Sequence, residues 1–138
     1  MFELSLEYLN TFANQIIFIS ALLGGFSLTV LVLLLDNKES SKLMASIFRI
    51  ATIATGAFLV SIFAMTKIFM MTTKDFPLEV ESEDLLLTRV IGVIVFLIGL
   101  VSVILIMSIS GWTKSKNLGW FTTIIGVITL VLTFLMLI

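Results

Sequence analysis

Cysteine and histidine are both absent from this chain of 138 residues. The first absence excludes disulfides and thiolate chemistry, and the second removes imidazole metal ligands and the most common general base. Charged residues make up 12% of the chain, whereas soluble domains average about 25%. No Asp or Glu lies in the middle of a long apolar run, which argues against an enzyme and against a proton-coupled transporter. We therefore expect no catalysis, no cofactor, no metal site and no nucleic-acid partner.

The chain is rich in hydrophobic residues, which make up 59% of it, and its mean hydropathy is +1.23. Four apolar runs reach or exceed the ~20 residues that a bilayer requires: Thr11–Leu35, Ala45–Met71, Leu85–Ile109 and Leu118–Ile138. Such runs must be helical, because lipid offers no partner for unpaired backbone groups. We predict an all-α polytopic membrane protein whose residues 1–138 form a single domain of four transmembrane helices.

The connections between these runs predict how the helices pair. Residues 36–42 join the first two runs and residues 111–117 join the last two, and connections this short favour antiparallel neighbours. The longer stretch Lys74–Arg89 joins the resulting two hairpins and contains Pro77, the one proline of the chain. Its carboxylates at Glu79, Glu81 and Glu83 indicate either an ordinary solvated loop or a segment that concentrates cations.

Charged residues sort to the two sides of the predicted bundle. The side with the N-terminus and the acidic loop has seven acidic and three basic residues, for a net charge of −4, whereas the other side has two acidic and five basic residues, for a net charge of +3. Short loops rich in Lys and Arg tend to stay in the cytoplasm. We therefore expect both termini outside, in a plasma membrane or a bacterial inner membrane. Glu3 and Glu7 also occupy positions where a signal peptide would need positive charge, so the first helix is expected to remain.

Small residues recur at helical spacing in the second, third and fourth runs. Such residues allow membrane helices to approach closely. The candidates for helix packing are Ala54, Ala57, Ser61, Ala64, Gly92, Gly99 and Gly126. These stripes favour packing within one bundle, and the alternative is that some of them hold subunits together.

The first run has a seam with a 3.5-residue period, which is typical of a packed helix face. The seam is polar at its N-terminal end and small in its middle: Glu3, Glu7, Asn10, Asn14, Ile17, Ala21, Gly24 and Leu28. One interpretation is that these residues line the water-filled mouth of a pore shared by several copies. The other is that they lie in an ordinary interface or in solvent, as polar residues near helix ends often do.

Part of the first run is similar to a known channel family. The segment Ala21-Leu22-Leu23-Gly24-Gly25-Phe26 resembles the first-helix motif A-L-L-S-G-F of the Orai family of four-span calcium channels, and Phe63-Ala64-Met65 and Val90-Ile91-Gly92 resemble stretches of its second and third helices. The resemblance implies a pore lined by the first helix with Phe26 at its constriction. The family's selectivity glutamate lies seven residues beyond that phenylalanine, where this chain has Leu33.

Two functions follow from these features. The first is a homo-oligomeric, cation-channel-like pore in the lipid bilayer with the first helix along its axis and cations as the permeant species. The second is a non-catalytic accessory subunit that packs against another membrane protein. A pore needs a water-accessible axis shared by several copies, whereas an accessory subunit needs only a face that packs against its partner.

Overall fold

A computed structural model describes residues 5–36 and 41–138, so Glu3, Lys38 and Glu39 lie outside the described residues. The chain forms four long helices, with short 3₁₀ turns before and after the third. The helices are α1 Leu6–Leu35, α2 Lys42–Met71, α3 Leu86–Ser110 and α4 Lys116–Leu137. The 3₁₀ turns are η1 Ser82–Leu85 and η2 Gly111–Thr113. All four helices are long and apolar enough to cross a membrane, which confirms the all-α, four-span prediction.

Serine side chains define where three of the helices begin. Ser5, Ser41 and Ser115 each accept a hydrogen bond from the backbone N–H three residues later, at 3.1–3.2 Å. These bonds satisfy N–H groups that have no partner inside the helix. Because of these caps, α1, α2 and α4 begin some residues before the apolar runs do.

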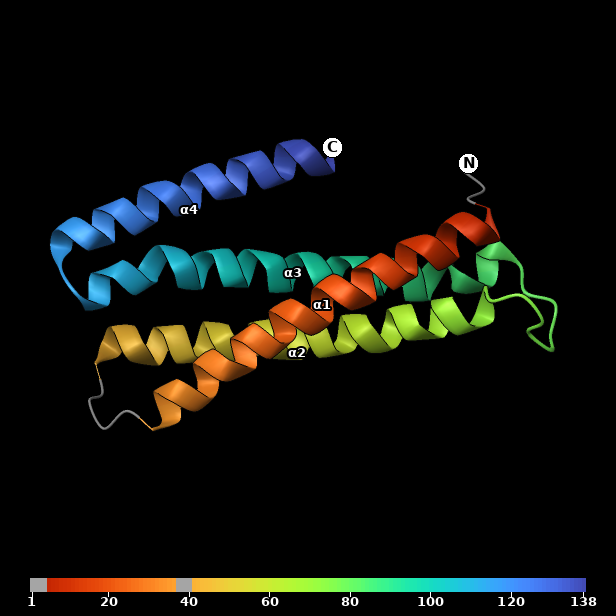
Figure 1. The fold of residues 1–138 in the computed structure, drawn as a ribbon, viewed down its shortest axis with the longest axis horizontal. Coiled ribbons are helices and arrows are strands. Elements are labelled where there is room, and N and C mark those ends of the chain that lie inside the picture. The colour runs from red at the N-terminus through yellow and green to blue at the C-terminus, as the bar shows by residue number, and fades with distance from the viewer. Residues whose placement is uncertain (1–4, 37–40) are drawn as a thin grey trace.

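The helices pack in the order of the chain, as Figure 1 shows. α1 and α2 form one antiparallel hairpin and α3 and α4 form another, as the short connections predict. α2 also packs along α3, and α1 crosses this pair obliquely. The result is a unit of α1, α2 and α3, with α4 attached along α3 and the turn that precedes α4.

Two groups of buried apolar side chains form the interior. The larger group lies between α1, α2 and the N-terminal part of α3, and it consists of Leu9, Ala13, Ile16, Ala54, Phe58, Met65, Ile68, Leu85 and Phe96. The smaller group, Ile47, Ala51 and Ile106, lies near the opposite end. Most other large apolar side chains are exposed, which is expected for a protein surface that faces lipid tails.

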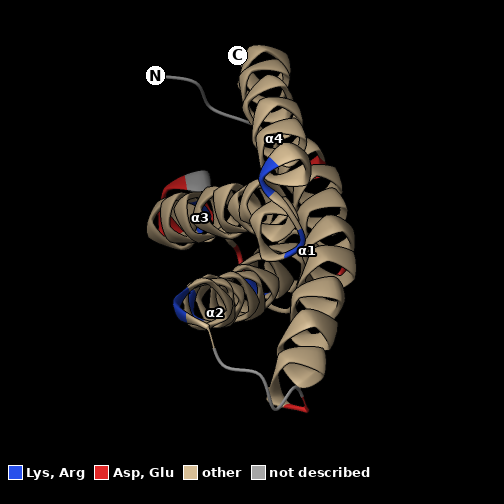
Figure 2. Cartoon of the chain, turned by 90° about the vertical axis from the view of Figure 1, so that its left-hand side faces the viewer, with Lys and Arg blue, Asp and Glu red and all other residues tan. Residues whose placement is uncertain are grey.

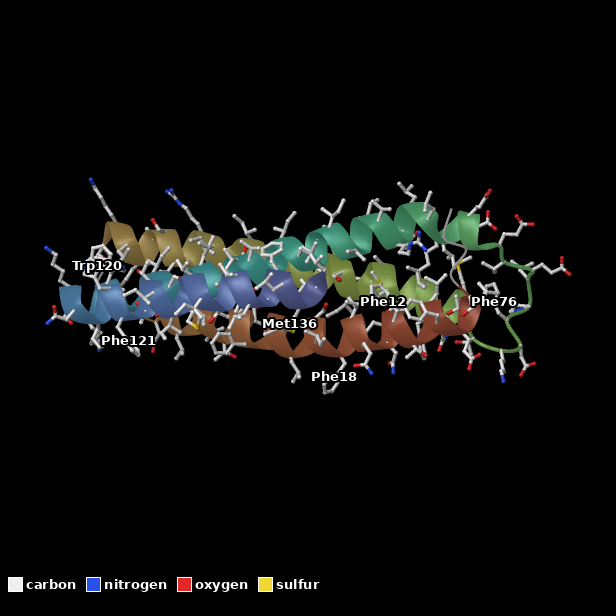
Figure 3. The ribbon with its side chains drawn as sticks, turned by 90° about the horizontal axis from the view of Figure 1, so that it is seen from above. Phe12, Phe18, Phe76, Trp120, Phe121 and Met136 are labelled. Atoms are coloured by element: carbon white, nitrogen blue, oxygen red, sulfur yellow. The ribbon has the colours of Figure 1, made fainter. Side chains whose placement is uncertain are left out.

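Charge is confined to the two ends of the bundle. Figure 2, which looks along the bundle, shows helices that are uncharged over most of their length. Figure 3 places Trp120 and Phe121 at one end and Phe76 at the other. Tryptophan at the end of an apolar helix is typical of the headgroup level of a bilayer.

Candidate functional site

The most polar region of the bundle lies where the N-terminal turns of α1 meet the end of α2. The Asn10 side-chain amide donates to the backbone oxygen of Phe69 at 3.0 Å, to Thr72 Oγ1 at 3.0 Å and to Thr73 Oγ1 at 3.4 Å. Both threonine hydroxyls in turn donate to the Phe69 oxygen, at 3.3 and 2.6 Å. One amide of α1 is thus tied to the last turn of α2 across about sixty positions of the sequence.

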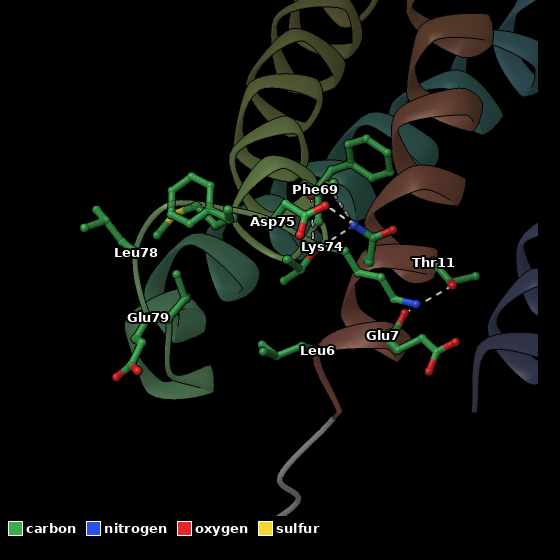
Figure 4. Close-up of a pocket in the computed structure, with 14 residues that line it drawn as sticks. Leu6, Glu7, Thr11, Phe69, Lys74, Asp75, Leu78 and Glu79 are labelled. Atoms are coloured by element: carbon green, nitrogen blue, oxygen red, sulfur yellow. Dashed lines mark hydrogen bonds between the residues drawn. The ribbon is translucent and has the colours of Figure 1, made fainter.

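A cavity of about 830 Å³ opens beside this contact, between α1 and the acidic loop. Figure 4 shows Glu7 and Thr11 on one side of it and Asp75, Leu78 and Glu79 on the other. The Lys74 side chain extends toward the first turns of α1. The cavity therefore brings carboxylates and an ammonium group to the mouth of the bundle.

Backbone geometry explains three of the loop's acidic residues. Asp75 has a φ of +72°, a left-handed conformation that Asp tolerates better than most residues. Glu81 and Asp84 form a reciprocal capping box around η1, in which the Glu81 N–H donates to Asp84 Oδ2 at 3.3 Å. Among the described residues, no three acidic side chains are close enough together to hold a metal ion. Asp75, Glu81 and Asp84 thus have a local role in the backbone of the loop.

The predicted seam of α1 divides between two faces of the helix. Asn10, Ile17 and Gly24 lie at the edge of the interface with α2, and Gly24 faces Phe58. Glu7, Asn14, Ala21 and Leu28 are exposed. The fully or nearly buried positions of α1 are Leu9, Ala13, Ile16, Ser20 and Ser27. The bundle-facing stripe thus follows different residues from the predicted seam.

The exposed face of α1 is polar over its first three turns. Glu7, Thr11, Asn14 and Gln15 are all exposed. The Thr11 hydroxyl donates to the backbone oxygen of Glu7 at 3.2 Å. Asn14 and Gln15 have no side-chain hydrogen-bond partner within residues 5–36 and 41–138. Two amides therefore point away from the bundle in a helix that spans the membrane.

The predicted packing residues of α2 and α3 lie along one interface. Ala54 and Ser61 are buried, and Ala57 and Ala64 are half-buried. A Cβ at Gly92 would lie 3.1 Å from the Cβ of Ala64 and would also strike the end of Met65. A Cβ at Gly99 would lie 2.9–3.0 Å from three ring atoms of Phe58.

A chain of hydroxyl groups crosses this interface and was missed by sequence reasoning. Ser20 Oγ of α1 donates to Ser61 Oγ of α2 at 3.5 Å, and Ser61 Oγ donates to the backbone oxygen of Gly92 of α3 at 3.1 Å. All three residues are buried. Periodicity selected Ser61 and Gly92, but nothing in the sequence distinguished Ser20 from the serines that bond within their own helix.

Gly126, the predicted packing residue of α4, lies against Ser108 of α3. A Cβ at Gly126 would overlap Ser108 Oγ and would lie 2.8 Å from Ser108 Cβ. Thr122 and Thr123 of α4 both donate to the Ser108 backbone oxygen, at 2.9 and 3.2 Å. Trp112 Nε1 donates to Thr123 Oγ1 at 2.9 Å, so the contact between α3 and α4 is concentrated near their shared turn.

Phe26 lies on a different face of α1 from Glu7 and Asn14. It is half-exposed and lines an apolar groove of about 650 Å³ between α1, α2 and α3, together with Val103 and Met107 of α3. Rotation of 100° per residue separates Phe26 from the Glu7–Asn14–Ala21–Leu28 line. The constriction implied by the Orai resemblance and the polar face of α1 therefore involve different sides of this helix.

Four apolar helices, packed in sequence order around a largely apolar interior, define a four-span helical integral membrane protein. The chain matches no family model, no curated protein and no solved structure.

Proposed function

We propose that the protein assembles as a homo-oligomer in which α1 faces a shared axis and lines a cation-permeable pore. One observation carries this proposal: the polar side chains Glu7, Thr11, Asn14 and Gln15 lie on the outer face of α1, away from the bundle. The resemblance of Ala21–Phe26 to the first-helix motif of the Orai family favours the same helix for the axis, although Phe26 itself lies on another face of α1.

Depth in the membrane makes these outward amides significant. At 1.5 Å per residue, the 30 residues of α1 extend about 45 Å, about 15 Å more than the hydrocarbon core. In a centred helix, Asn14 lies eight residues after Leu6 and therefore about 4 Å inside the hydrocarbon. An amide without a partner is unfavourable there, so water or a second protein surface at this face stabilises the arrangement.

The exposed face of α1 supplies the parts of a simple pore. Glu7 from each copy forms an acidic ring at the mouth, which concentrates cations. Asn14 lies two turns deeper, and the same face continues with Phe18, Ala21, Gly25 and Leu28. This apolar part closes by dewetting and gives a pore that is shut at rest. The acidic loop lies at the same end as Glu7 and adds to the negative potential of the mouth.

The second candidate is an accessory subunit of a larger membrane complex. The observation that favours it is the exposure of α4. Gly119 and Gly126 are the buried residues of this helix, and its other residues are exposed or half-buried. An accessory subunit buries such a face against another protein, and its α1 lines no water-filled pore. The two candidates therefore differ in which helix contacts the neighbouring chain.

Cysteine cross-linking distinguishes the two candidates, because the native chain has no cysteine to interfere. We expect Asn14→Cys to form disulfide-linked dimers in native membranes on mild oxidation. Ile53→Cys, at an exposed position on α2, serves as the matched control and is expected to remain monomeric. Cross-linking at Ile53→Cys but not at Asn14→Cys would contradict an axial α1.

Conductance tests the pore itself. The purified oligomer in planar bilayers is expected to show rare, cation-selective openings, and Glu7→Gln is expected to lower the preference for cations over anions. Glu79→Gln removes an exposed carboxylate from the loop and is expected to have the smaller effect. An oligomer that stays silent under all voltages and cations would count against a pore.

A further inference from the structure

A groove of about 380 Å³ lies between the N-terminal ends of α1 and α3, on a different side of α1 from the cavity beside the acidic loop. Tyr8 and Phe12 form one wall, with ring centroids 6.3 Å apart and planes inclined by 15°. Val90, Val93 and Ile94 of α3 form the other wall. Arg89 is the one charged residue among those that line it.

The Arg89 guanidinium has no partner in the described part of the chain. It is half-buried, yet no carboxylate, carbonyl or aromatic ring of residues 5–36 and 41–138 pairs with it. Its neighbours one turn away on the helix are Leu85, Leu86, Gly92 and Val93, none of which carries charge. Glu7 lines the acidic-loop cavity instead, and Asp84 is engaged in the capping box of η1.

The position of Arg89 along α3 matches the phosphate level of a bilayer. The 25 residues of α3 extend about 37 Å at 1.5 Å per residue, so a centred helix projects about 4 Å beyond each face of the hydrocarbon. Arg89 is three residues after Leu86 and therefore lies about 4 Å along the helix, at the boundary itself. A guanidinium here meets phosphodiester groups, which it binds through two parallel hydrogen bonds.

We propose that this groove binds a phospholipid, with the lipid phosphate on Arg89 and one acyl chain along Phe12, Val93 and Ile94. Charge complementarity carries the choice of occupant, because a lone cation stands at the head of a groove whose walls are otherwise aromatic and aliphatic. A free phosphate would satisfy the guanidinium but would leave the walls uncovered. The lipid covers both, and it ties the start of α3 to the start of α1.

Native mass spectrometry of the intact protein released from detergent micelles tests the site. The probes are dioleoylphosphatidylglycerol and dioleoylglycerol, which have the same acyl chains but differ in the phosphoglycerol headgroup. We expect the phospholipid to bind at least tenfold more tightly than the diacylglycerol, and Arg89→Gln to remove that difference. Lys114→Gln, which removes an exposed cation at the other end of the bundle, serves as the charge control and is expected to bind like the parent.

A second variant tests the groove. Ile94 is about half exposed, so Ile94→Trp narrows the groove without entering the core. It is expected to weaken binding of both probes, while unchanged helicity by circular dichroism shows that the fold is kept. Equal binding of the two probes to the parent protein, or full binding by Arg89→Gln, would overturn the phosphate contact. Full binding of both probes by Ile94→Trp would overturn the placement of the acyl chain.

Discussion

The ring of Phe58 occupies the space that a side chain at Gly99 would need. A Cβ at Gly99 would lie 2.9 Å from both Cε1 and Cζ of Phe58. The ring cannot move aside, because Phe58 is fully buried, its own Cβ lies 3.2 Å from where a Gly24 Cβ would be, and Phe96 packs edge-on with a centroid distance of 6.2 Å. α1, α2 and α3 therefore meet at one aromatic side chain held between two glycines.

Replacing Gly99 with alanine is expected to destabilise the bundle by about 1–3 kcal/mol, which is the usual cost of overfilling a packed interior. Gly56→Ala is the matched control, since no atom lies within 4 Å of a Cβ there and alanine favours helix by up to ~1 kcal/mol. Thermal unfolding in mild detergent measures both changes. Equal melting temperatures for the two variants would mean that the Phe58 contact is not close-packed.

The attachment of α4 is predicted to depend on the contact between Gly126 and Ser108. Gly126→Ala introduces a Cβ that overlaps the Ser108 hydroxyl, so α4 is expected to separate from α3 while α1, α2 and α3 stay together. Trp112 and Trp120, the two tryptophans of the chain, lie near the turn between α3 and α4 with ring centroids 5.7 Å apart. Their fluorescence therefore reports a separation of α4 from α3. Ser108→Gly in the same chain removes the obstructing atoms and is expected to restore the parent spectrum. A double variant as altered as the single one would point to another cause.

Hydropathy and loop length were sufficient to predict the four spans and the two hairpins, because lipid requires long apolar helices and short turns permit few arrangements. The same signals did not predict the packing of α2 on α3, since the long acidic connection places no tight limit on how the hairpins meet. Helix starts at Leu6, Lys42 and Lys116 were also missed. They depend on serine caps just outside the apolar runs.

Which side of α1 faces the bundle was the least predictable feature. In a soluble protein the apolar face is buried, but in a membrane both the lipid-facing and the bundle-facing sides of a helix are apolar. Polar residues were therefore the main signal in the sequence for the orientation of α1, and they lie on both its bundle-facing and its outer side. Asn10 bonds to α2, whereas Asn14, four residues later and one turn along, points away. Ser20 carried no distinguishing signal, because serines readily bond within their own helix.

The orientation in the membrane is open to a direct test. The side with Lys114 and Lys116 has a net charge of +3 and the side with the acidic loop has a net charge of −4, so we expect the short turns in the cytoplasm. Glu79→Cys and Lys114→Cys place single thiols at exposed positions of opposite ends. A membrane-impermeant thiol reagent on intact cells is expected to label Glu79→Cys alone, with both labelled after permeabilisation. Labelling of Lys114→Cys alone in intact cells would reverse the topology.

Asn10 and Asn14 are expected to affect different properties, although both are asparagines near the same end of α1. Asn10→Ala removes the amide that bonds to Phe69 and Thr72, and it is expected to lower stability by about 0.6–2 kcal/mol, the range of interhelical hydrogen bonds in membranes. Asn14→Ala breaks no bond within the described chain and alanine favours helix, so its melting temperature as a monomer should be no lower than that of the parent. The proposed axial role of α1 requires instead that Asn14→Ala shift the oligomer toward smaller species.

Two measurements on each variant separate these effects. Unfolding in a detergent that keeps the protein monomeric gives the stability of the bundle, and cross-linking in native membranes gives the size of the assembly. Asn10→Ala is expected to change the first more than the second, and Asn14→Ala the second alone. Because both substitutions replace the same amide with alanine in the same helix, the gain in helix propensity and the loss of polarity are the same in both and cannot account for opposite patterns. If Asn14→Ala left the assembly intact, the outward amides would not be needed for assembly, and the argument for an axis along α1 would lose its main support.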